Sequence, residues 1–213
     1  SAGLRAIAPP WSTKTPTIAP LVPTLFLAVM TLAHFPGRDP FRMAAWQAPR
    51  GMRGWLTDDS SLTARIRSRC GRFSLQRVSQ GKGCVLPDEL AALGVQRHGA
   101  LWQREVLLLA DGEPVVFARS LVAATTIPAA WHLLHGLGGR PPAAVLFDDP
   151  RVRRSALEAA RLDARDFRWH RAVQALGQPA LPALWARRSA FRRHGVPLLV
   201  TEIFLPAIRN LNP

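Results

Sequence analysis

Tyrosine is absent from this sequence, lysine occurs only as Lys14 and Lys82, and cysteine only as Cys70 and Cys84. Two cysteines in 213 residues exclude the dense disulfide framework on which small secreted domains depend. No Cys-x-x-Cys pair is present, which excludes the common zinc-cluster motifs. We therefore expect free thiols, no bound metal and a reducing, cytoplasmic location.

Acidic residues are scarce as well: 14 aspartates and glutamates stand against 28 lysines and arginines, which gives a net charge of +14. Three interpretations are open: nucleic-acid binding, attraction of a membrane surface or an anionic substrate, and a compositional bias toward arginine. Arginines cluster at residues 65–72, 151–154 and 187–193, without a zinc-finger, homeodomain or RNA-recognition signature. We expect no nucleic-acid partner and only a weak association with membrane surfaces.

The familiar motifs of hydrolases and nucleotide-binding proteins are also missing. The chain contains no GxSxG nucleophile elbow, no P-loop and no GxGxxG dinucleotide fingerprint. Hydrophobic residues make up 48% of the sequence, which is enough for a sizeable core and excludes wholesale disorder.

The first 42 residues differ from the rest of the chain. They contain seven prolines and a single acid, Asp39. The apolar stretch from Ile18 to Ala33 is short for a membrane span of about 20 residues. A signal peptide, a disordered tail and an over-early start of translation are the alternatives; we favour the last, because Met43 opens a segment typical of a bacterial N-terminus. We predict an N-terminal extension over 1–42 and a globular domain over 43–213.

Helical signals after Met43 predict three helices. Each has capping residues, a proline or acids at its start, or a glycine at its end. The predicted helices cover residues 62–66, 86–93 and 157–176.

Two pairs of apolar runs predict β-hairpins. The first pair flanks Asp111-Gly112, a strong hairpin signal, and the second flanks the turn at 193–197. No helix lies within either pair, so the strands are antiparallel. The runs are 102–109 with 115–122, and 185–191 with 198–205. The sequence thus predicts an α+β fold with a single antiparallel β-sheet and helices packed on one flank.

Two charged residues stand out inside these strands. Strand alternation places Arg104 on one face with Trp102 and Val106. Glu202 is the only acid of its strand, and both faces of that strand are apolar. Burying a charge lowers stability unless the charge is paired with an opposite one, so an unpaired buried charge points to a role in binding or catalysis. A structural Arg–Glu pair and a catalytic role are equally compatible with this pattern.

The hairpins carry a family resemblance. The segment Leu101–Pro114 (LWQREVLLLADGEP), with Arg119 in the following ARSLV, resembles the central motif of the chorismate pyruvate-lyase family. The segments 184–189 (LWARRS) and 195–207 (GVPLLVTEIFLPA) resemble its closing hairpin. A weaker segment, 55–62 (WLTDDSSL), resembles the start of its N-terminal helix.

The resemblance implies an enzyme that cleaves chorismate into 4-hydroxybenzoate and pyruvate, the first committed step of ubiquinone biosynthesis in many bacteria. It implies an antiparallel sheet flanked by helices, with the product in an enclosed cavity, and no metal or cofactor. We expect a monomer whose partner is the small molecule chorismate.

The same resemblance implies the site residues. The ring-carboxylate-binding arginine falls on Arg104 and the buried catalytic glutamate on Glu202, which would hydrogen-bond the 4-hydroxyl and act as acid or base. Product contacts fall on Leu62 and Pro142, where the family often has methionine and leucine, and proline has no backbone N–H to donate. Arg119 would be a second active-site arginine. Because it lies on the strand next to that of Arg104, we expect both to converge on the two carboxylates of chorismate.

One alternative is a ligand-binding protein that is not an enzyme. Effector-binding domains of some bacterial transcription regulators resemble the lyase fold, and such a domain would bind a small aromatic acid without cleaving it. The proline-rich residues 1–42 do not supply a helix-turn-helix region, which argues against a regulator.

Overall fold

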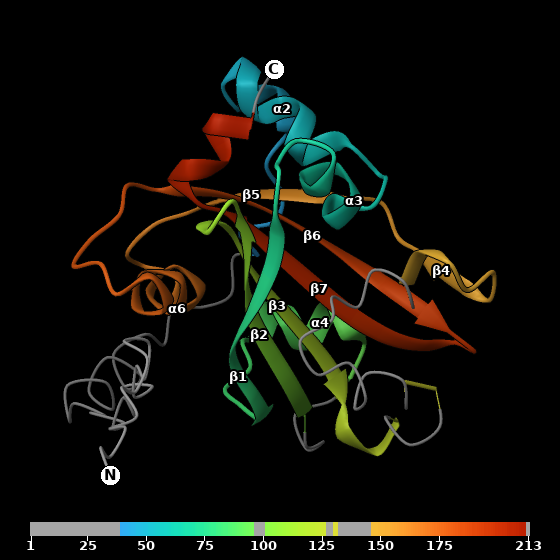
Figure 1. The fold of residues 1–213 in the computed structure, drawn as a ribbon. Coiled ribbons are helices and arrows are strands. Elements are labelled where there is room, and N and C mark those ends of the chain that lie inside the picture. Colours follow the sequence, from blue (N-terminus) through green and yellow to red (C-terminus); the bar gives the residue numbers. More distant parts are fainter. Residues whose placement is uncertain (1–38, 96–100, 127–129, 132–145, 212–213) are drawn as a thin grey trace, which may run out of the picture. The chain divides into compact units, whose positions relative to one another are not determined.

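The computed structural model describes residues 39–95, 101–126, 130–131 and 146–211. Figure 1 shows the chain as a ribbon. Its α-helices are α2 (Arg50–Thr57), α3 (Leu62–Arg67), α4 (Pro87–Leu93) and α6 (Phe167–Leu176), and its 3-10 helices are η1 (Ala45–Gln47), η2 (Ala124–Thr126) and η4 (Pro206–Leu211). Its strands are β1 (Phe73–Lys82), β2 (Leu101–Ala110), β3 (Glu113–Ala123), β4 (Val152–Arg154), β5 (Glu158–Leu162), β6 (Leu184–Arg193) and β7 (Val196–Phe204).

The strands form one antiparallel sheet in the order β1-β2-β3-β7-β6-β4, and β5 also pairs with β6. The two predicted hairpins are its centre, because β3 of the first pairs with β7 of the second. The predicted α+β fold with a single antiparallel sheet is confirmed.

Both hairpins turn through two residues in the left-handed region. Asp111 and Gly112 have φ of 51° and 87°, and His194 and Gly195 have φ of 52° and 78°. Two positive φ values are the signature of the type I′ turn, whose twist matches that of the flanking strands. The Asp-Gly and His-Gly pairs therefore place the hairpins where the sequence predicts them.

A β-bulge interrupts the first hairpin close to its turn. Leu109 pairs with Pro114, whereas Leu108 already pairs with Val116, so Val115 is an extra residue in β3. The carbonyl of Val115 accepts a hydrogen bond from the N–H of Leu205. A one-residue shift exchanges the two faces of a strand, so beyond the bulge every β3 side chain lies on the face opposite to that of an unbulged hairpin.

Helices contact both faces of the sheet, rather than one flank as predicted. On one face, Leu62 and Ile66 of α3 pack with Val106 and Leu108 of β2. On the other face, α6 packs against apolar residues of the sheet, which include Leu107, Phe117 and Ile203. The physical reason is that the central strands are apolar on both sides, so each side needs a cover.

The helices predicted over 62–66 and 86–93 are present as α3 and α4. The third, over 157–176, is wrong in its first half. Residues 158–162 form β5 along the edge of β6, and α6 begins at Phe167 after Asp166, whose carboxylate accepts a hydrogen bond from the N–H of Arg168. Pairing with β6 thus overrides the helix propensity of this alanine-rich segment.

The packed domain includes residues ahead of Met43. Phe41 is 3% exposed and lies in the core beneath α6. Asp39 forms an ion pair with Arg188 of β6. Residues 39–42 therefore belong to the same unit as the sheet, although most of the predicted 1–42 extension lies outside the described residues. Within the described part of the chain, we find no helix with the length and hydrophobicity of a membrane span.

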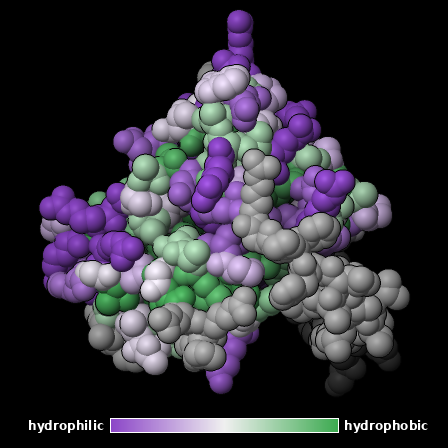
Figure 2. All heavy atoms as spheres, turned by 180° about the vertical axis from the view of Figure 1, so that it is seen from behind, coloured by the Kyte–Doolittle hydropathy of each residue, from purple (hydrophilic) through white to green (hydrophobic). Residues whose placement is uncertain are grey.

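Figure 2 shows one face of the molecule coloured by hydropathy. Hydrophilic side chains gather in several groups, with apolar surface between them. Of the three arginine clusters, those at α3 and its C-terminal turn and at β4 include exposed arginines, whereas in the cluster on β6 only Arg192 is exposed.

Candidate active site

A pocket opens between the sheet and helix α3. The sheet contributes residues of β2, β3, β6 and β7, which are small or apolar apart from Arg104 and Glu202, and the far wall comes from α3, Leu146 and Phe147. We call it the sheet pocket, and its lining residues are Ser61, Leu62, Thr63, Arg104, Val106, Leu108, Ala118, Ser120, Leu146, Phe147, Phe191, Val200 and Glu202. Three of the five predicted site residues, Leu62, Arg104 and Glu202, therefore line one pocket.

Arg104 is the cation of the sheet pocket. It lies in the middle of β2, opposite Ser120 of β3, and is 3% exposed. Burial lowers the pKa of its guanidinium, and the positive charge of Arg77 lowers it further. Arginine remains protonated despite such shifts because its ordinary pKa exceeds 12. A desolvated guanidinium among apolar side chains suits a carboxylate ligand.

Glu202 is the anion of the sheet pocket and is held by an arginine that the resemblance did not assign. The Nε of Arg187 donates to Oε2 of Glu202 at 2.6 Å, and the two residues lie opposite each other in β6 and β7. The Arg187 side chain is 1% exposed, whereas that of Glu202 is 16% exposed. The pair therefore presents a fixed carboxylate to the pocket, and its second oxygen can accept a hydrogen bond from a ligand.

Arg187 also joins the sheet to the start of the pocket's far wall. Its Nη1 donates to the carbonyls of Trp55 at 2.9 Å and Asp58 at 2.6 Å, at the end of α2. Helix α3 then begins after Ser61, whose hydroxyl accepts a hydrogen bond from the N–H of Ala64. This arrangement places Leu62, the first residue of α3, against the pocket.

The two charges of the sheet pocket lie on different strands. Arg104 on β2 and Glu202 on β7 are separated by one strand, β3. Two strand spacings amount to about 10 Å between backbones, and the free volume of the pocket between the side chains is about 40 Å³. Val106, Ala118 and Val200 form an apolar floor beneath that space.

Comparison with known proteins identifies the family. The family model described as chorismate lyase matches residues 42–211. A protein of Aromatoleum aromaticum named probable chorismate pyruvate-lyase is 53% identical over 166 residues, which are 78% of this chain and 90% of that protein. A protein of the same name from Azoarcus sp. is 53% identical over 167 residues, 77% of this chain and 88% of that protein. The chain belongs to the chorismate lyase family.

Among solved structures, PhnF from Mycobacterium smegmatis has a TM-score of 0.50 and 16% sequence identity, and the match covers 70% of this chain and 65% of that one. At this identity the likeness shows the fold alone.

The structure does not bring every predicted residue to the pocket of this chorismate lyase family member. Arg119 lies opposite Glu105 rather than Arg104, so it belongs to the other face of the sheet. There it is 1% exposed and bonded to Glu89, Glu105 and Gln103, at 2.9, 2.8 and 2.6 Å. The expectation that Arg104 and Arg119 converge on one ligand is wrong. Pro142 lies outside the described residues.

Arg119 is instead the centre of a buried charge cluster. Glu89 comes from α4 and Arg171 from α6, and Glu105 accepts from both Arg119 and Arg171. The backbone carbonyl of Cys84 accepts a further hydrogen bond from Arg119. Burial alone would lower the pKa of Arg119, but the charge of Glu89 and its hydrogen bond raise it above the usual range. This cluster fastens α4 and α6 to the sheet and leaves the sheet pocket to Arg104.

Arg187 is the functional residue that sequence reasoning missed. The sequence contained the signal for it. The same number of residues separates Arg187 from His194 and Glu202 from Gly195, so an unbulged hairpin pairs Arg187 with Glu202, and β6 and β7 contain no bulge there. Arg104 shares the face of Val106, as predicted, because alternation along β2 alone decides its face.

Proposed function

We propose that this chain cleaves chorismate to 4-hydroxybenzoate and pyruvate. The observation that carries the proposal is the placement of Arg104 and Glu202 on one apolar pocket from either side of β3. The names of the relatives from Aromatoleum and Azoarcus support the same substrate and products.

Arg104 is the residue suited to the ring carboxylate of chorismate. Its guanidinium is permanently charged and offers two parallel N–H donors. With the carboxylate fixed there, the ring extends over Val106 and Ala118 toward Glu202. The 4-hydroxyl then donates to Glu202, whose position Arg187 fixes.

The reaction needs few catalytic groups from the protein. The bond between the ring and the ether oxygen breaks, and its electron pair leaves with enolpyruvate. The hydrogen on the hydroxyl-bearing carbon leaves as a proton, so the ring becomes aromatic, and enolpyruvate takes up a proton at its methylene carbon to give pyruvate. Because aromatisation supplies the driving force, orientation and one proton transfer are the main tasks. Glu202 is the group placed to move that proton.

The product and its surroundings suggest a place in the cell. 4-Hydroxybenzoate formed here would enter ubiquinone biosynthesis as its first committed precursor. Cys70 and Cys84 are both free thiols, which fits a reducing cytoplasm.

The test is to incubate the full chain with chorismate and quantify both products. Equimolar 4-hydroxybenzoate and pyruvate are expected. Arg104→Met should lower kcat/KM at least about 100-fold, because a desolvated carboxylate loses its partner. Arg161→Met, at an exposed arginine of β5, is the matched control and should retain activity.

A second variant separates the roles of Glu202. Glu202→Gln keeps the shape and can still accept from the 4-hydroxyl, but it cannot carry the proton. Full turnover by this variant would refute proton transfer by Glu202. Tight binding of 4-hydroxybenzoate by the wild type without turnover of chorismate would instead indicate a ligand-binding module.

A further inference from the structure

The proposed reaction requires a second cation, and this inference rests on that proposed function. Chorismate carries two carboxylates, and Arg104 accounts for the one on the ring. The enolpyruvyl group is attached beside the carbon that bears the 4-hydroxyl, so its carboxylate lies on the Glu202 side of the sheet pocket. Two like charges at close range repel each other strongly where water is excluded. A positive group near Glu202 must therefore receive the second carboxylate.

Arg187 does not meet this need. Its Nε is bonded to Glu202 and its Nη1 to the carbonyls of Trp55 and Asp58. Its side chain is 1% exposed. Its charge is therefore already paired with the carboxylate of Glu202.

Arg154, the last residue of β4, approaches the same region from the other edge of β6. Its Nε donates to the hydroxyl of Ser189 at 2.9 Å, and its Nη1 donates to the carbonyl of Asp59 at 2.7 Å. Ser189 lies two residues beyond Arg187 on β6, so the side chains of Ser189 and Arg187 share a face of the sheet. Two directional bonds thus fix the Arg154 guanidinium on the face that carries Glu202.

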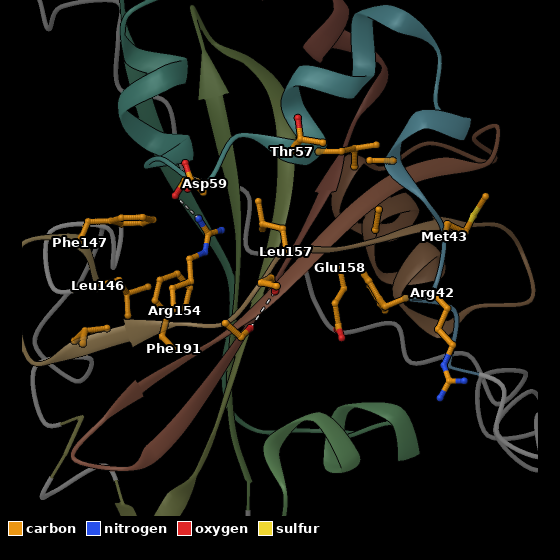
Figure 3. A pocket seen from close by; sticks show the side chains of 17 residues that line it. Arg42, Met43, Thr57, Asp59, Leu146, Phe147, Arg154, Leu157, Glu158 and Phe191 are labelled. Atoms are coloured by element: carbon orange, nitrogen blue, oxygen red, sulfur yellow. Dashed lines mark hydrogen bonds between the residues drawn. The ribbon is translucent and has the colours of Figure 1, made fainter.

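Arg154 lines the larger of two adjoining cavities, near Phe147 and Phe191 (Figure 3). Its guanidinium carbon lies 5.4 Å from the ring centroid of Phe147 and 5.1 Å from that of Phe191. Both rings, together with Leu146, line the sheet pocket and also a larger space of about 830 Å³, which we call the neighbouring hollow. Arg154 and the segment from Ser155 to Ala159 line the hollow as well.

Arg154 is a half-buried cation. Burial lowers the pKa of its guanidinium; the charge of Glu202 raises it, that of Arg187 lowers it, and those of Asp59 and Asp58 raise it. Within the described ranges, Arg154 forms an ion pair with no carboxylate, whereas Arg187 and Arg188 each have one or more. A partly desolvated guanidinium without a carboxylate gains more from an incoming anion than one that is already paired.

We propose that Arg154 binds the enolpyruvyl carboxylate of chorismate at the boundary between the sheet pocket and the neighbouring hollow. Breaking the ether bond leaves 4-hydroxybenzoate between Arg104 and Glu202. Pyruvate, formed when enolpyruvate is protonated at its methylene carbon, remains against Arg154. The neighbouring hollow then gives pyruvate a route out that does not pass the aromatic product.

The test uses the full chain with Arg154→Met, which removes the charge but keeps much of the side-chain length, and Arg154→Lys, which keeps the charge. Arg153→Met is the matched control, because Arg153 is the exposed neighbour on β4. For each protein the KM for chorismate and the Kd of 4-hydroxybenzoate are measured. Arg154→Met should raise the KM about 30-fold or more, the effect of losing a charge-assisted contact to a carboxylate. The Kd of 4-hydroxybenzoate, which lacks the enolpyruvyl group, should stay within about threefold of wild type, and Arg154→Lys should be intermediate.

Two results would overturn the assignment. A KM for chorismate within threefold of wild type in Arg154→Met would show that no carboxylate contact was lost. A parallel loss of 4-hydroxybenzoate affinity would show that Arg154 only supports the packing of Phe147 and Phe191. If the wild type does not turn chorismate over, the proposed reaction fails, and the Kd of unreacted chorismate replaces KM in the same comparison.

Discussion

The guanidinium of Arg187 holds the carboxylate of Glu202 at 2.6 Å between Nε and Oε2, where β6 and β7 form one wall of the sheet pocket. The same guanidinium bonds the carbonyls of Trp55 and Asp58 at the end of α2. One buried cation therefore fixes both the carboxylate proposed to move a proton and the backbone that leads into α3.

Replacing Arg187 should cost stability as well as activity. Arg187→Met leaves a largely buried carboxylate and two carbonyls without their donor, so the free energy of unfolding should fall by about 3–5 kcal/mol. Glu202→Gln keeps an acceptor for Arg187, and its loss should be under about 1.5 kcal/mol. Urea unfolding of both variants measures the difference. Equal stability of Arg187→Met and wild type would contradict a structural role for the pair.

Replacing Arg104 should weaken ligand binding, whereas replacing Arg119 should lower stability. Arg104→Met should weaken 4-hydroxybenzoate binding at least about 100-fold, with little change in unfolding free energy, because methionine fills the same apolar site. Arg119→Met leaves Glu89 buried without its arginine and leaves Glu105 with Arg171 alone, so it should lose about 3–5 kcal/mol of stability. While folded, it should bind 4-hydroxybenzoate within about threefold of wild type. A folded Arg119→Met protein that does not bind the product would place Arg119 in the site after all.

The contrast between these two arginines shows where sequence reasoning stops. Arg104 is as far from Asp111 along the chain as Arg119 is from Gly112. A hairpin without a bulge would therefore place the two arginines opposite each other on the same face of the sheet, which is the arrangement the sequence predicts. The extra residue Val115 shifts the register, so Arg119 pairs with Glu105 and changes face. Pro114 cannot donate to a strand ladder, which makes a bulge beside it favourable, but the position of a bulge depends on tertiary contacts such as the bond from Leu205 to Val115.

The second hairpin shows the opposite case. No bulge intervenes between the His194-Gly195 turn and the Arg187–Glu202 pair, so turn chemistry and alternation suffice to place both residues. The position of Arg154 cannot be predicted from turn chemistry and alternation. Its approach to Ser189, which is 35 residues away along the chain, depends on the pairing of β4 with β6. The helix predicted over 157–176 is partly wrong for the same reason, because an alanine-rich segment becomes a strand only when the edge of another strand is available for pairing.

The charge cluster on the far face should make stability depend on acid pH. Burial alone would raise the pKa of the Glu105 carboxyl, but hydrogen bonds from Arg171 and Ser79 and the charges of Arg171 and Arg119 hold it below its usual value. The stabilisation is therefore complete above the unfolded pKa of about 4.3 and is lost as pH falls through the lower folded pKa.

Glu105→Gln is the variant that tests this dependence. The unfolding free energy of wild type should exceed that of the variant by a constant amount from pH 5.5 upward, where about all of the carboxyl is ionised in both states. The difference should shrink below about pH 4.3. Urea unfolding at several pH values gives the comparison. A difference that grows as the pH falls would mean that Glu105 is stabilised in its protonated form.

The packing of Phe41 predicts where the chain can be shortened. A chain that begins at residue 36 keeps Asp39 and Phe41, whereas one that begins at Met43 removes both. Phe41 is 3% exposed and lies under the guanidinium groups of Arg168 and Arg188, at 5.0 and 4.4 Å. Loss of a buried phenylalanine costs about 3–5 kcal/mol, and Arg188 also loses the Asp39 carboxylate. The chain from Met43 should therefore unfold at lower urea concentration than the chain from residue 36, and Phe41→Ala in the full chain should reproduce most of the loss. If all three proteins are equally stable, the contacts of residues 39–42 contribute nothing to the fold.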